Sequence, residues 1–104
     1  MSINFTKAIV DQLQREIADI ESKSMNVKTK KEKAQSKINQ LQRDIKLSQS
    51  HSDLSSKMTR INKLNEEIKK LDRIQADLSK QLVTKKASLK QHLAKKSLHG
   101  ETNG

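Results

Sequence analysis

The stretch SQSHSDLSS, from Ser48 to Ser56, lies at the middle of the 104-residue chain. Serine and aspartate side chains compete with the backbone for hydrogen bonds, so they favour helix ends over helix interiors. Long segments with helical periodicity flank this stretch on both sides. We therefore predict an all-α fold, a long antiparallel two-helix coiled-coil hairpin, with helices at about residues 2–48 and 53–98 and a turn at about 48–53. Either Ser50, together with Asp53, or Ser52 alone is expected to cap the second helix.

Before the turn, the inward positions recur every three or four residues without a change of phase. This seven-residue repeat is typical of a coiled coil. The pattern is weakest between Ser24 and Ala34, where small or charged residues replace large apolar ones. The residues expected at the interface are Leu13, Ile17, Ile20, Val27, Ile38, Leu41 and Ile45.

After the turn, a second apolar stripe continues to the end of the expected helix. Its interface residues are predicted to be Leu54, Met58, Ile61, Leu64, Ile68, Leu71, Leu78, Leu82 and Leu89. The spacing from Met58 to Leu64 predicts a local three-residue slip in the repeat. The stripe passes through either Ile74 or Gln75. Gly100 is expected to stop the helix, which leaves residues 99–104 as a disordered tail.

Folding the chain at the turn places the two stripes in a definite register. Leu64 then faces Ile38, and Leu82 faces Ile20. The same register sets three acidic residues beside three lysines: Asp11, Glu16 and Asp19 beside Lys90, Lys86 and Lys85. Apolar residues beside the main stripe widen it, namely Ile9, Leu47, Ile74 and Val83. We therefore expect a homo-oligomer, a dimeric or higher helical bundle, with an isolated rod as the alternative.

The composition limits the class of protein. Hydrophobic residues make up 32% and charged residues 33% of the chain, and Phe5 is the only aromatic residue. Such values are also found in disordered chains, but disorder does not predict apolar residues held in one phase. There is no cysteine, no apolar run of about 20 residues and no signal peptide, so we expect a cytoplasmic protein.

No constellation of residues suggests catalysis. His92 and His99 lie about 10 Å apart along a helix, which is too far for shared metal binding, and His51 falls at the turn. There is no glycine-rich phosphate loop and no activated serine or cysteine motif. We therefore expect neither an enzyme nor a small-molecule substrate, and no metal or other cofactor.

The formal net charge of +10 is the other notable feature. Lysines and one arginine are expected to form a basic belt around the middle of the hairpin: Lys28, Lys30, Lys31, Lys33, Lys69, Lys70 and Arg73. Such a belt would attract nucleic acid or an anionic membrane surface weakly and in a salt-dependent way. Charge alone, without stacking aromatic residues, is no more than a general signal for these partners.

The segment from Lys37 to Leu71 resembles the N-terminal coiled coil that precedes Toll/interleukin-1 receptor (TIR) and other effector domains in bacterial defence and signalling proteins. The resemblance rests on the run Ile38, Leu41, Gln42 and Ile45, the break Ser50, Ser52 and Leu54, and Lys57 with Ile61. It implies a non-catalytic self-association or scaffold module with a fused or neighbouring effector domain. The alternatives are a basic rod that binds nucleic acid or a membrane surface, and an adaptor that docks a partner at the turn around His51.

Overall fold

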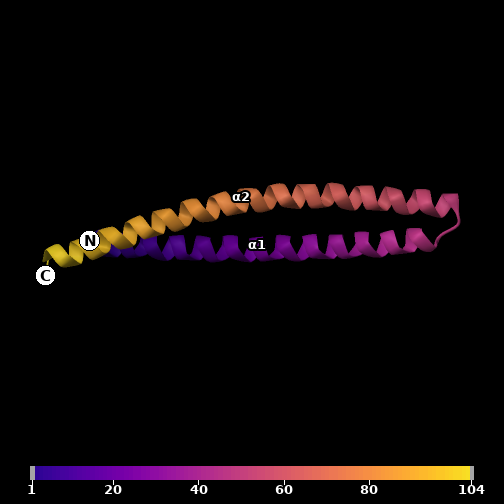
Figure 1. Ribbon diagram of the computed structural model, residues 1–104. Helices are drawn as coiled ribbons and strands as arrows, with labels where there is room; N and C mark the ends of the chain where they lie inside the picture. The colour runs from indigo at the N-terminus through magenta and orange to yellow at the C-terminus, as the bar shows by residue number, and fades with distance from the viewer. Residues whose placement is uncertain (1, 104) are drawn as a thin grey trace. The chain divides into compact units, whose positions relative to one another are not determined.

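The chain is all-α and consists of two long helices joined by a short turn (Figure 1). The computed structural model describes the backbone of residues 2–103 and the side chains of residues 5–94. Helix α1 spans Ser2–Leu47 and helix α2 spans His51–Asn103. No strand occurs in the backbone between residues 2 and 103. Proline is absent from the sequence and glycine occurs twice, so little in either segment opposes helix formation.

The turn is confined to residues 48–50 and is closed by serine side chains. At the end of α1, the amide of Ser48 donates to the carbonyl of Ile45 (3.2 Å). The hydroxyl of Ser50 accepts a hydrogen bond from the amide of Asp53 (3.3 Å), and its carbonyl accepts one from Leu54 (2.9 Å). Ser50 is therefore the N-cap of α2, which decides between the two caps that the sequence left open.

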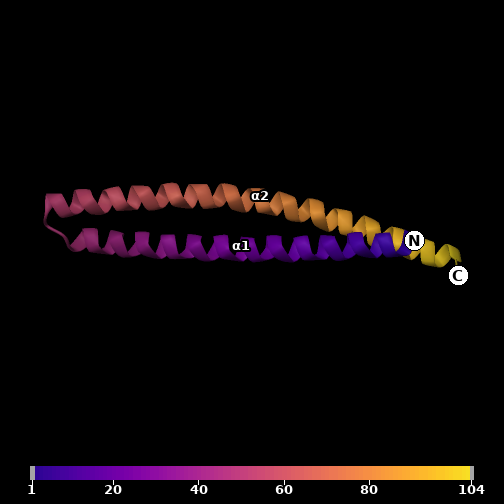
Figure 2. The ribbon, with the colours of Figure 1, turned by 180° about the vertical axis from the view of Figure 1, so that it is seen from behind.

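The chain divides into two compact units, each containing a part of both helices. The tip unit is Met25–Ala76, and the end unit is Met1–Ser24 with Asp77–Gly104. In the tip unit the two helix segments lie side by side in opposite directions (Figures 1 and 2). Their core is a cluster of Ile38, Leu41 and Ile61, with Ile45, Leu64 and Ile68 packed against it. Ile38 and Leu64 thus belong to one cluster, as the predicted register requires.

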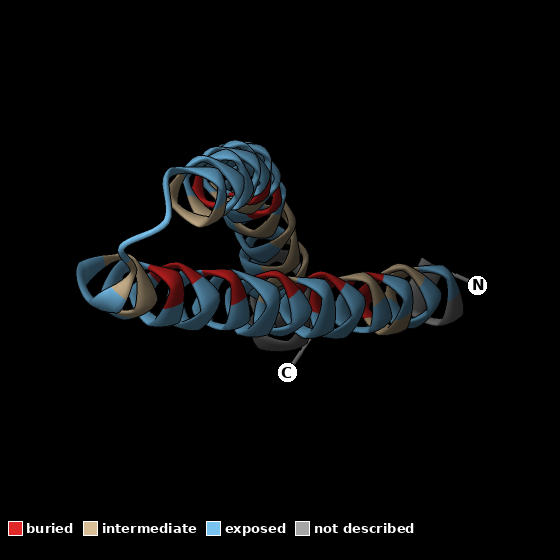
Figure 3. Ribbon diagram, turned by 90° about the vertical axis from the view of Figure 1, so that its right-hand side faces the viewer, coloured by how far each residue is buried: buried red, intermediate tan, exposed pale blue. Residues whose placement is uncertain are grey.

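The end unit has the same construction. Val10, Leu13, Ile17 and Ile20 of α1 are buried, and so is Leu78 of α2. In both units the buried residues recur along one face of each helix (Figure 3). This is the pattern of a narrow coiled-coil seam and not of a rounded core.

Two predictions for α2 are wrong: that Met58 lies at the interface, and that the repeat slips near it. Met58 is 52% exposed, whereas the neighbouring Lys57 is half-buried. With Lys57 in place of Met58, the seam of α2 follows an unbroken seven-residue repeat from Leu54 to His92. No change of phase is needed, because Lys57 lies seven residues before Leu64.

The structure also differs from the prediction at the C-terminal end. Helix α2 continues through Gly100 to Asn103, beyond the predicted end at residue 98 and into the predicted tail. Glycine lowers the stability of a helix interior by about 1 kcal/mol relative to alanine, which disfavours a helix without forbidding it. The side chains of Lys95, Lys96 and His99 lie outside the described residues.

Candidate functional site

The seam is the first candidate site, because it is where the two helices meet in each unit. Most of the predicted interface residues are withdrawn from solvent. The buried ones are Leu13, Ile17, Ile20, Val27, Ile38, Leu41, Ile61, Leu71 and Leu78. The half-buried ones are Ile45, Leu54, Leu64, Ile68, Leu82 and Leu89. Only Met58 lies outside the seam.

Four polar residues of α2 occupy seam positions. The apolar pattern missed three of them and left the fourth, Gln75, open as an alternative to Ile74. Lys57, Gln75, Lys85 and His92 are all half-buried and fall on the same seven-residue repeat as the leucines. The seven-residue repeat alone predicts these positions. Gln75 lies three full repeats after Leu54. The other three lie three residues after a leucine of the same series, namely after Leu54, Leu82 and Leu89. Polar residues at single seam positions restrict the register of a coiled coil at some cost in stability.

In the tip unit, a charge pair joins the helices across one flank of the seam. Lys31 Nζ of α1 lies 2.6 Å from Asp72 Oδ1 of α2, with about half of each side chain exposed. The sequence predicted that Lys31 belongs to a belt of cations, so its acidic partner corrects that prediction. The pairing follows from the position of the seam. Asp72 directly follows the buried Leu71, so it lies at the edge of the seam within reach of Lys31.

The predicted basic belt is consequently not uniform. Lys31 is paired with Asp72, and Lys69 with Glu66 at 3.4 Å. The remaining members are exposed and form no ion pair with any side chain in the described range: Lys28, Lys30, Lys33, Lys70 and Arg73. Exposed lysines that form no ion pair are the ones available to an anionic partner.

In the end unit, Glu16 and Lys85 join the two helices. Lys85 Nζ lies 2.5 Å from Glu16 Oε2, an oxygen that is shielded from solvent. Gln12 donates to the other carboxylate oxygen (3.1 Å). The hydrogen bond from Lys85 and then that from Gln12 lower the pKa of Glu16. The sequence set Lys86 beside Glu16, so the observed pairing is shifted by one residue, and Asp19 pairs within α1 with Lys23.

A second charged group stabilises the start of α2. Lys57 Nζ donates to Asp53 Oδ2 at 2.6 Å. That hydrogen bond, and a further one with the Ser48 hydroxyl, lower the pKa of Asp53. The same Ser48 hydroxyl accepts a hydrogen bond from the amide of Ser50 (3.3 Å). Negative charge in the first turn of a helix also suits the helix dipole.

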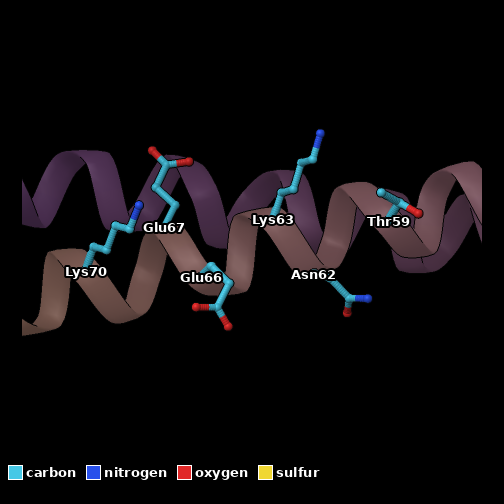
Figure 4. Close-up of a pocket in the computed structure, with 6 residues that line it drawn as sticks. All are labelled: Thr59, Asn62, Lys63, Glu66, Glu67 and Lys70. Carbon is cyan, nitrogen blue, oxygen red and sulfur yellow. The ribbon is translucent and has the colours of Figure 1, made fainter.

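A shallow open depression is lined by α2 alone: Thr59, Asn62, Lys63, Glu66, Glu67 and Lys70. Figure 4 shows Lys63, Glu67 and Lys70 pointing to one side of α2 and Asn62 and Glu66 to the other. No group of three or more histidine, cysteine or acidic side chains in residues 5–94 could hold a metal ion. His51 is exposed, and His92 is half-buried.

The comparisons with known proteins give no relative. No protein family, no curated protein and no solved structure matches this sequence. Within the described part of the chain, neither helix contains a segment long and apolar enough to cross a membrane.

Proposed function

We propose that this chain is a non-catalytic coiled-coil module that associates with further copies of itself. The main support is the incomplete burial of its seam. Among the side chains of residues 5–94, none is less than 2% exposed. Two helices can bury only a narrow stripe of each other, and isolated pairs of this kind are of low stability. A second hairpin would cover the apolar surface that the first leaves exposed.

Exposed apolar side chains beside the seam give further support. In the tip unit, Ile74 is 48% and Met58 52% exposed, and they lie on opposite flanks of α2. Met25 and Leu47 of α1 are exposed as well. Isolated exposed apolar residues are common on protein surfaces. These residues, however, flank a seam whose own apolar side chains are only partly buried. The resemblance of the Lys37–Leu71 segment to coiled coils beside bacterial effector domains favours the same function, that of holding copies of an effector domain together.

Light-scattering mass at low and high salt tests the proposal. We expect twice the 11.9-kDa chain mass or a higher multiple at both salt concentrations, since apolar association is not screened by salt. A monomer at both concentrations would contradict the proposal.

A pair of variants locates the interface. Met58→Lys with Ile74→Lys should lower the mass to that of the monomer without loss of helicity, because both changes lie outside the seam. Asn62→Lys with Asn65→Lys adds the same charge at exposed polar positions of α2 and should leave the mass unchanged. Equal effects of the two pairs would show that charge, and not apolar contact, controls association.

A further inference from the structure

We propose that the tip unit binds the phosphate backbone of duplex nucleic acid through one flank of its seam, independently of base sequence. Five lysines make up this basic face: Lys30, Lys33 and Lys37 of α1 with Lys63 and Lys70 of α2. All five are exposed, and none forms an ion pair with a described side chain. Lys37 and Lys63 lie outside the belt predicted from the sequence, and the other three belong to it.

The seam positions place these lysines on one side. Each of the five directly precedes a seam position: Lys31, Ala34, Ile38, Leu64 and Leu71 respectively. Successive helical residues are turned by about 100°, so residues that directly precede seam positions share one flank of their helix. In an antiparallel pair, this flank of one helix adjoins the same flank of the other. Figure 4 shows Lys63 and Lys70 on one side of α2, as the pattern requires.

The opposite flank differs in charge. Residues that directly follow seam positions include Lys28, Lys46 and Lys69, together with Glu32 and Asp72. The pair between Asp72 and Lys31 forms on this flank and neutralises the one seam lysine of α1. On the basic face, Glu67 lies between Lys63 and Lys70, and Asp44 accepts a hydrogen bond from Gln40 nearer the turn. The basic face therefore has an excess of three positive charges, and the opposite flank an excess of one.

The chemistry of the face favours duplex nucleic acid over other polyanions. Single-strand binding sites use aromatic stacking, and the only aromatic residue of the chain, Phe5, lies outside the tip unit. Basic helices bind membranes by inserting an adjacent apolar face. On this flank the exposed apolar side chains of Leu47 and Ile74 lie beyond the ends of the lysine series and form no continuous apolar face. Lys30 and Lys37 lie about 10 Å apart along the helix. The same length of duplex carries about six phosphate charges, a number comparable with the five lysines.

Salt dependence of binding to a labelled random-sequence duplex provides the test. Five phosphate contacts predict that affinity falls about 500-fold between about 50 and 200 mM salt. The variant Lys30→Gln with Lys33→Gln and Lys70→Gln retains two of the contacts, so its affinity should fall only about 12-fold over the same range. Glutamine is a good helix former, so the helices are expected to persist.

The opposite flank supplies the matched control. Lys28→Gln with Lys46→Gln and Lys69→Gln removes the same net charge and should retain the salt dependence of the unmodified protein. Replacing Lys30, Lys33 and Lys70 by arginine should retain it too. Circular dichroism and light-scattering mass on each variant separate loss of binding from loss of fold or assembly.

Three results would overturn the inference. The first is equal loss of binding in the two glutamine variants, which would show that net charge alone attracts the duplex. The second is the absence of duplex binding at about 50 mM salt, where five contacts should be strongest. The third is binding to phosphatidylserine vesicles without binding to the duplex, which would assign the face to a membrane surface.

Discussion

Replacing Ile38 by alanine should destabilise the tip unit more than the same replacement of an exposed isoleucine outside the seam. Ile38 is 3% exposed and packs in the cluster with Leu41 and Ile61. The substitution removes three buried carbons, at about 0.8 kcal/mol each. Alanine recovers up to about 0.7 kcal/mol through its better helix propensity. The free energy of unfolding should therefore fall by about 2 kcal/mol, near the lower limit for buried isoleucine-to-alanine changes.

The matched control is Ile74→Ala, in the same unit but 48% exposed. It removes the same atoms, but about half of this side chain is already exposed to solvent. The loss of unfolding free energy should therefore stay below about 1 kcal/mol. Urea unfolding followed by far-ultraviolet circular dichroism measures both values. The protein concentration must be fixed, because association would add to the apparent stability. Equal losses in the two variants, or a loss below about 0.5 kcal/mol for Ile38→Ala, would refute the assignment of Ile38 to the core.

Two further predictions concern the turn and the charge pairs. Ser50→Ala should lower the unfolding free energy by about 1 kcal/mol, whereas Ser52→Ala should change it little, as measured by the same urea titration; equal effects would remove Ser50 as the cap. Glu16 and Asp53 have lowered pKa values in the fold, so each contributes stability above its unfolded pKa that is lost as pH falls through its folded pKa. The melting temperature should therefore fall on acidification below about pH 4.5, and it should fall less in Glu16→Gln and in Asp53→Asn than in the unmodified protein.

Sequence periodicity was sufficient to predict α1, because its large apolar residues keep one phase from Val10 to Ile45. It was less successful for α2, where lysine and glutamine occupy seam positions and Met58 lies beside one of them. Apolar character was then a poor guide, since a lysine can cover the seam with its aliphatic stem while its ammonium group reaches Asp53. A strict count of seven from Leu64 would have selected Lys57.

The charge pairs could be predicted only in outline. The register brought acidic residues of α1 near lysines of α2, yet the partner of Glu16 is Lys85 and not Lys86. A shift of one residue turns a side chain by about 100° around its helix, which spacing alone cannot resolve. The pairing of Lys31 with Asp72 was missed because the belt was read from charge density without regard to which flank each residue occupies.

The shortness of the connection at residues 48–50 determines how the chain can fold. Contacts near the turn, such as those of Ile38 and Ile61, close a much shorter loop than the pair of Glu16 and Lys85. The difference in loop-closure entropy is about 1 kcal/mol in favour of the contacts near the turn. Folding should therefore begin beside Ser50 and proceed along the helices towards the termini, and hydrogen exchange should be slowest in the tip unit.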